Sequence, residues 1–331
     1  MNLATLRSLV GAMTGAGGVE GFRDAAEQEV MRLGDLISAG EHAVTRLNTA
    51  PPDGGVNVMI GTMPLAQKLR LLPIMLRTMN SVTKCADAMK DDLTPTKHSA
   101  TEETWNRLIE LAKARGAVEV GFARISVHDI FKEYAIPYRN AIVFTIDMEK
   151  EAINTAPSYD ALVEVLKTYA ALGDVALALT DALREQGYGA YPGFPIGGLV
   201  DYVRVAEAAG IGAIGYHGML ISPTEGTRQR INVVFTNMET PAPAPNPHAW
   251  VLDFCAACRK CVRSCPPKAI YTTAQVSPMT GRKSTLHYQN CLDYYATHQG
   301  CAVCVKVCPF SHTGYAKIER GYRRVQARVA A

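Results

Sequence analysis

The chain has 331 residues, of which 48% are hydrophobic and 20% are charged, and its formal net charge is +3. This size allows two or three units with cores of their own. The small net charge argues against a nucleic-acid binder, in which basic residues are denser and clustered. No uncharged apolar run reaches about 18 residues, so we expect no membrane span. Met1–Met13 lacks the paired arginines or basic stretch of a leader, so we expect a cytoplasmic protein.

Residues 1–95 are expected to form a helical N-terminal region. Its most apolar helix candidate is Leu65–Val82, and loops are expected at Gly15–Gly18 and Pro51–Gly55. Cys85 lies apart from the other cysteines and is expected to be a buried core residue. Flexible core packing explains the methionines of this region better than a ligand or redox role. These are Met59, Met63, Met75, Met79 and Met89.

Residues 96–240 are expected to form a mixed α/β unit, because strand and helix patterns alternate along them. A capping box at Ser99–Glu102 predicts a helix start, and Gly116 is suited to follow the helix end. A long helix is expected at Asp160–Glu185 and a shorter one at Leu199–Ala209. The expected strands are Val118–Ile125, Ala141–Met148 and Ile231–Asn237.

Residues 241–331 are expected to form a third region. Alternating prolines from Pro241 to Pro247 favour an extended linker of polyproline II type, which marks the boundary. A helix rich in Arg and Lys is expected at Gly314–Val329. A solvated helix face explains its charge better than a nucleic-acid arm does.

Eight of the nine cysteines lie between Cys255 and Cys308, at spacings that indicate metal ligands rather than disulfides. The first motif is the C-x2-C-x2-C-x3-C-P run of bacterial ferredoxins, in which three cysteines hold one 4Fe–4S cluster and the fourth binds another. The second motif contains three cysteines and a following proline, and Cys291 can supply its missing ligand. The first motif comprises Cys255, Cys258, Cys261 and Cys265, and the second Cys301, Cys304 and Cys308.

The two motifs together provide complete ligand sets for two 4Fe–4S clusters in a ferredoxin-like domain. Zinc sites also use C-x2-C pairs, but they rarely combine three cysteines at this spacing with a terminal C-P. Two clusters in one domain would conduct electrons. The first cysteine set is Cys255, Cys258, Cys261 and Cys308, and the second cysteine set is Cys265, Cys291, Cys301 and Cys304.

Several segments between Thr101 and Ser311 resemble the corrinoid-dependent reductive dehalogenases. Epoxyqueuosine reductase, a cobalamin-dependent tRNA-modifying enzyme, shares Ala209–Gly212 and the cluster pattern. The segments are Pro137–Met148, Ala156–Ser158, Tyr169, Leu183–Ala190, Ala206–Gly212, Leu220–Pro223, Gly226–Arg230, Phe235–Asn237, Cys291–Tyr295 and Cys308–Ser311. The resemblance implies a nitroreductase-like α/β domain that binds base-off cobalamin beside a cluster and reduces a carbon–halogen bond or an epoxide. Cubane clusters reach about −700 mV, low enough for such chemistry.

The resemblance also implies roles for individual residues. Tyr169 stands at the position of the proton-donating tyrosine, and Arg228 or Arg230 at that of the cation that assists it. From the residues alone, Tyr169 lies on the apolar stripe of its helix, and structural ion pairs explain the arginines equally well. Five further residues are implied at the corrinoid, although His217 is more simply read as a structural histidine. They are Tyr188, Gly210, Gly212, His217 and Pro223.

The chain departs from the family pattern at Tyr191–Pro195, and it lacks the aspartate that epoxyqueuosine reductases place in this region. We therefore expect a corrinoid-dependent iron–sulfur oxidoreductase acting on a small organic molecule, halogenated or not. An external ferredoxin, flavodoxin or reductase is expected to supply electrons. Two alternatives stay open, a non-catalytic electron carrier or corrinoid-handling protein, and a tRNA-modifying enzyme. The N-terminal helices could cap the corrinoid or form a homodimer contact.

Overall fold

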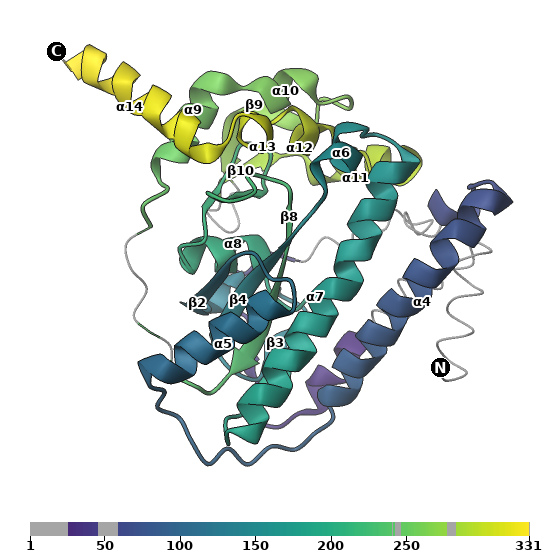
Figure 1. Ribbon diagram of the computed structural model, residues 1–331, viewed down its shortest axis with the longest axis vertical. Coiled ribbons are helices and arrows are strands. Elements are labelled where there is room, and N and C mark those ends of the chain that lie inside the picture. The colour runs from purple at the N-terminus through teal and green to yellow at the C-terminus, as the bar shows by residue number, and fades with distance from the viewer. Residues whose placement is uncertain (1–25, 46–58, 240, 242–245, 277–282, 331) are drawn as a thin grey trace.

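The computed structural model describes residues 26–45, 59–239, 241, 246–276 and 283–330 (Figure 1). At its centre is a four-stranded antiparallel sheet with the strand order β2-β4-β8-β5. Three helices pack on this sheet, α5 and α7 on one face and α8 on the other. The strands are β2 (Val120–Arg124), β4 (Asn140–Asp147), β5 (Ala190–Pro192) and β8 (Gln229–Thr236), and the helices are α5 (Glu102–Ala114), α7 (Tyr159–Glu185) and α8 (Tyr202–Ala208).

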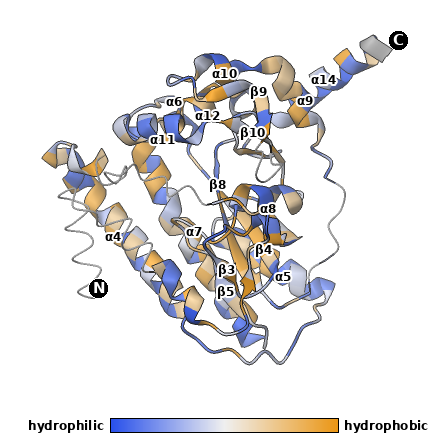
Figure 2. Cartoon of the chain, turned by 180° about the vertical axis from the view of Figure 1, so that it is seen from behind, coloured by the Kyte–Doolittle hydropathy of each residue, from blue (hydrophilic) through white to orange (hydrophobic). Residues whose placement is uncertain are grey.

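Strand β4 lies in the middle of the sheet and is buried on both faces. Ile142 and Phe144 pack with α5 and α7, whereas Ala141 and Val143 belong to the core beneath α8. Helices on both faces explain why this strand is a continuous apolar run rather than an alternating one. Figure 2 shows the hydrophobic residues concentrated on these central strands.

Helix α7 spans the length of the sheet, and α4 (Leu65–Ala88) runs beside it (Figure 1). The Oγ of Ser158 caps α7 by accepting a hydrogen bond from the backbone N–H of Ala161. Gly173 permits the close approach of the two helices, because a Cβ at this position would lie 1.8 Å from the Oγ of Ser81. Helix α4 therefore belongs to the same packed body as the sheet.

Two sequence predictions differ from the fold. Helix α5 is capped by Thr101, whose hydroxyl accepts a hydrogen bond from Thr104 N–H, and not by Ser99. Thr101 is the residue with the extended backbone that an N-cap needs. The first 95 residues are also not all helical, because β1 (Ile37–Ser38) pairs with β3 (Ala135–Ile136). That pairing supplies a strand edge which periodicity in so short a segment cannot reveal.

Side chains from the N-terminal region enter the core of the α/β unit. Val82, Met89 and the fully buried Cys85 pack with residues of β4 and β8, so the expectation of a core role for Cys85 is confirmed. The loops expected at Gly15–Gly18 and Pro51–Gly55 lie outside the described residues, as does most of the proline-rich linker. The domain boundaries near 95 and 240 stay predictions.

The cysteine-rich segment forms a cap of short helices at one end of the molecule (Figure 1). It comprises α9 (Trp250–Cys258), α10 (Lys260–Ser264), β9 (Ile270–Val276), β10 (Lys283–Leu286), α11 (Tyr288–Thr297), α12 (Val303–Val307), α13 (Pro309–His312) and α14 (Tyr315–Ala330). The remaining elements are η1 (Val30–Arg32), η2 (Val127–Asp129), α6 (Lys150–Asn154), β6 (Ala213–Ile214) and β7 (Leu220–Ile221). Among the described helices, none combines the length and the apolar character that a membrane span requires.

Candidate redox site

The two cysteine motifs have the same backbone conformation, a left-handed residue followed by a short helix. Helices α10 and α12 each follow a residue in the left-handed conformation, Arg259 (φ 48°, ψ 22°) and Ala302 (φ 59°, ψ 14°). Each helix is followed by a cysteine that precedes a proline, Cys265 after α10 and Cys308 after α12. The same local turn therefore presents both sets of thiols.

The first cysteine set surrounds a cavity of about 280 Å³, which we call the cysteine cavity. All four members of the set line it, and all nine cysteines of the chain are free thiols. The other lining groups are aromatic, cationic or apolar, apart from one histidine. They are His217, Phe254, Arg259, Lys260, Pro309 and Phe310.

Cys255, Cys261 and Cys308 of this set are buried, and the sulfurs of Cys255 and Cys308 already receive hydrogen bonds. Burial raises the pKa of Cys255 to about 12, and a hydrogen bond from the backbone of Tyr216 opposes the rise. Burial likewise raises the pKa of Cys308 to about 12, against hydrogen bonds from the backbone of Phe310 and the side chain of Thr227. Donors aimed at buried sulfurs suit thiolates that carry negative charge when they bind iron.

The second cysteine set also converges. Burial raises the pKa of Cys291 to about 11, and the neighbouring Cys301 and Cys265 raise it further. Burial raises the pKa of Cys304, and the other three members of the set add to the rise. The Sγ of Cys265 accepts a hydrogen bond from the backbone N–H of Ala269 at 3.2 Å.

A second cavity, of about 590 Å³, lies where α4, α7 and α11 meet, and we call it the tyrosine cavity. Its lining is largely apolar, with two phenols from Tyr169 and Tyr295. Tyr295 also lies close enough to Cys291 and Cys301 to interact with them electrostatically. The remaining lining residues are Met59, Ile60, Met75, Thr78, Met79, Leu166 and Ile196.

The methionines expected to be core packing are indeed buried, and Met59, Met63, Met75 and Met79 belong to one core cluster. Three of them, Met59, Met75 and Met79, also line the cavity. Sequence reasoning did not single out Tyr295, whose only signal was its place in a segment that resembles the dehalogenases. These residues come from helices far apart in the chain, so no local pattern joins them.

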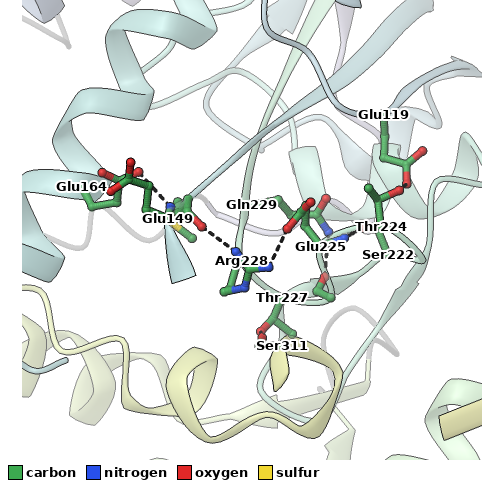
Figure 3. Close-up of polar contacts among 12 residues, drawn as sticks. Glu119, Glu149, Glu164, Ser222, Thr224, Glu225, Thr227, Arg228, Gln229 and Ser311 are labelled. Atoms are coloured by element: carbon green, nitrogen blue, oxygen red, sulfur yellow. Dashed lines mark hydrogen bonds and ion pairs between the residues drawn. The ribbon is translucent and has the colours of Figure 1, made fainter. Parts of the chain in front are cut away.

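The two candidate arginines have different surroundings. The guanidinium of Arg230 lies over the ring of Tyr169, 5.2 Å from its centroid, and its buried Nε has no hydrogen-bond partner among the described residues. Arg228 instead pairs with Glu225 at 2.6 Å and donates to the carbonyl of Met148 at 2.7 Å (Figure 3). The structure thus brings Arg230, and not Arg228, to the tyrosines.

The loop just before β8, which contains Thr227 and Arg228, also contacts the cysteine-rich cap. The hydroxyls of Thr227 and Ser311 are 2.6 Å apart and buried, as Figure 3 shows. Burial raises the pKa of Tyr295, the nearby Tyr169 raises it further, and Arg230 opposes the rise. Residues at the start of β8 and just before it therefore contact the cap through Ser311 and lie near Tyr295 of the tyrosine cavity.

The five residues implied at a corrinoid separate into two groups. Four of them line neither cavity. The Tyr188 hydroxyl donates to the Ser99 carbonyl inside the core, and Pro223 is exposed in a turn. Gly210 (φ 74°) follows the end of α8, and a Cβ at Gly212 would lie 2.2 Å from the carbonyl oxygen of Ile221. His217 is buried and lines the cysteine cavity, away from the tyrosines.

Comparison with known proteins agrees with this architecture. Residues 254–312 match the family described as a 4Fe-4S dicluster domain. Tetrachloroethene reductive dehalogenase of Sulfurospirillum multivorans is 34% identical over 180 residues, which are 52% of this chain and 35% of that protein. Epoxyqueuosine reductase of Lactococcus garvieae is 29% identical over 132 residues, 35% of this chain and 33% of that protein.

A solved reductive dehalogenase, described in terms of B12-dependent dehalogenation, superposes with a TM-score of 0.68 at 19% identity. The match covers 92% of this chain and 49% of that chain. This chain spans about a third of the length of the curated relatives that it matches. The expected fold class, mixed α/β with a C-terminal two-cluster domain, is confirmed. In sequence and in fold, the chain is a relative of the reductive dehalogenases that carries a 4Fe–4S dicluster domain at its C-terminal end.

Proposed function

We propose that the chain is a corrinoid-dependent iron–sulfur reductase that cleaves a bond in a small organic substrate. The observation that carries the proposal is the position of Tyr295, which lines the tyrosine cavity and also interacts with Cys291 and Cys301. A redox group at the second cysteine set would adjoin this cavity. The names of the relatives point to the same chemistry.

In this proposal each cysteine set holds one 4Fe–4S cluster. As in two-cluster ferredoxins, the last cysteine of each motif would bind the cluster of the other motif. Cys308 of the second motif lies with the first set, and Cys265 of the first motif lies with the second set. Electrons would pass from the first set to the second, because the second adjoins the tyrosine cavity. The cysteine residues supply thiolates, and the backbone donors around them stabilise those charges.

The character of the lining of the tyrosine cavity, rather than its volume, favours a corrinoid. The lining is apolar, it includes flexible methionines that adapt to a large ring, and it lies beside proposed cluster ligands. Cobalamin, when bound, supplies a reducible cobalt centre for breaking a carbon–halogen bond. Met59, Met75, Met79 and Ile196 are the side chains that we expect to hold it.

The chain itself would handle the proton. Replacing a carbon-bound halogen by hydrogen consumes two electrons and one proton and releases halide. Tyr169 offers its phenolic proton in the cavity, and Arg230 over its ring stabilises the charge left on the oxygen. Excluding water from the apolar lining would strengthen that electrostatic effect.

Anaerobic reconstitution tests the proposal. The protein is loaded with iron, sulfide and cobalamin, freed of unbound cofactor, and assayed with reduced viologen against a panel of organohalides. We expect about eight irons and one corrinoid per chain, and release of halide over many turnovers. Eight irons without corrinoid uptake would contradict the reductase proposal and leave an electron carrier.

The alternatives predict other results in the same preparation. A corrinoid-handling protein would bind cobalamin and turn over no substrate. A tRNA-modifying enzyme would bind tRNA with an affinity that falls steeply with salt. The cytoplasmic location, the external electron donor and the homodimer contact stay predictions.

A further inference from the structure

His217 is the one histidine among the residues that line the cysteine cavity. It lies in the turn between β6 and β7 and is only 3% exposed. Gly215 makes room for the ring, because a Cβ there would lie 2.9 Å from Cε1 and 3.3 Å from Nε2 of His217. The ring is therefore held in one orientation by close packing.

The hydrogen bonds of the ring determine which nitrogen carries the proton. The backbone N–H of Met219 donates to Nδ1 of His217 at 3.2 Å, so Nδ1 is an acceptor and bears no proton. An imidazole whose Nδ1 accepts carries its proton on the other ring nitrogen, so Nε2 is a donor.

That donor has no partner. Nε2 of His217 is buried and makes no hydrogen bond to any described residue. Buried donors in native proteins are nearly always satisfied, so an acceptor is expected in the adjoining space. Arg259 and Lys260 in the cavity wall are themselves donors, and Phe254, Pro309 and Phe310 offer aromatic or apolar side chains. The side-chain acceptors among these lining residues are the cysteine sulfurs.

We propose that His217 tunes the cluster of the first cysteine set by donating a hydrogen bond from Nε2–H to a sulfur of that cluster or of its ligands. Hydrogen bonds to cluster sulfurs favour the more negatively charged reduced state and so raise the reduction potential. His217 would make the first cluster easier to reduce than it would be without this hydrogen bond. The inference rests on the proposed binding of two clusters.

Two variants distinguish the effect of losing the hydrogen bond from the effect of losing the volume of the His217 ring. His217→Leu removes the donor and keeps an apolar side chain of similar size, whereas His217→Gln retains an N–H at the end of the side chain. We expect the midpoint potential of the first cluster, followed by EPR during a redox titration, to become more negative in His217→Leu and to recover in His217→Gln. The second cluster of the same sample is the internal control and should not shift.

A measurement on the wild-type chain guards against loss of the cluster in the variants. Pulsed EPR of the reduced protein with ¹⁵N-labelled histidine should reveal one histidine nitrogen and one exchangeable proton coupled to the first cluster. Absence of that coupling would overturn the inference, as would unchanged potentials in a fully loaded His217→Leu protein. Failure to find about eight irons in the wild type would instead refute the proposed function, so the two failures are distinguishable.

Discussion

At the scale of single residues, the candidate chemistry depends on one tyrosine and the cation above it. Tyr169 lies on the buried stripe of α7, where sequence reasoning alone placed a core residue, yet its ring borders a cavity. The guanidinium of Arg230 is 5.2 Å from the centroid of that ring, and its Nε has no hydrogen-bond partner in the part of the chain that the structure describes. A phenol beside a cation in an apolar wall is suited to donate a proton.

Tyr169→Phe removes the proposed proton and little volume. We expect turnover to fall by about 100-fold or more, because a positioned general acid contributes at least that factor, while iron and corrinoid contents stay unchanged. Steady-state halide release measures the effect. Tyr138→Phe is the matched control, since Tyr138 packs by the core near Tyr191 and lines neither cavity. Full turnover in Tyr169→Phe would refute the role of this tyrosine.

Replacing Arg228 should mainly lower stability, whereas replacing Arg230 should mainly lower kcat. Arg228→Met breaks a largely buried pair with Glu225 and leaves the Met148 carbonyl without its donor. We expect it to lower the free energy of unfolding by about 2 kcal/mol, measured by chemical denaturation. Arg230→Met should lower kcat with a smaller loss of stability. The reverse pattern would show that Arg228 is the assisting cation.

At the scale of elements, the cavity exists because α4 approaches α7 closely enough to bring its methionines to Tyr169. The approach depends on Gly173, opposite Ser81. Periodicity in the sequence predicted α7, β4 and β8 nearly to their ends, because each has a continuous buried face. It could not predict the cap at Thr101 or the β1–β3 pair, since these depend on single hydrogen bonds and on a partner elsewhere in the chain.

Gly173→Ala tests this helix contact. The new Cβ would lie 1.8 Å from Ser81 Oγ and 3.1 Å from Ser81 Cβ, so the helices must move apart. We expect a loss of about 1–3 kcal/mol in the free energy of unfolding. Ser81→Ala combined with Gly173→Ala should restore part of it, because the serine Oγ has no hydrogen-bond partner to lose among the described residues. Strictly additive effects in this double-mutant cycle would contradict direct contact.

At the scale of the whole molecule, the cysteine-rich cap lies at one end of the protein (Figure 1), and its helix α11 contributes Tyr295 to the tyrosine cavity. The second cysteine set faces Tyr295, whereas the cavity of the first set is bordered by the exposed Arg259 and Lys260. An external donor would therefore deliver electrons at the first set, and a basic rim there favours a carrier with an acidic surface.

Lys260→Glu should weaken the use of an acidic ferredoxin or flavodoxin. We expect kcat/KM for that carrier to fall by about tenfold at low ionic strength, with the difference shrinking as salt screens the charges. Turnover driven by a small viologen should be unaffected. Lys113→Glu, at the end of α5, is the control on a surface away from the cap. Equal losses in both variants would point to a nonspecific charge effect.

Local sequence determined the ligand sets, the central strands and the long helix. Cysteine spacing and apolar periodicity express contacts made within a turn or across one face, so they can be read along the chain. Only the tertiary structure decided which arginine meets Tyr169, that three methionines and Tyr295 line one cavity, and that His217 lines the cavity of the first cysteine set. Those features arise where elements distant in sequence pack together, and no local pattern records which side chains will share the space between them.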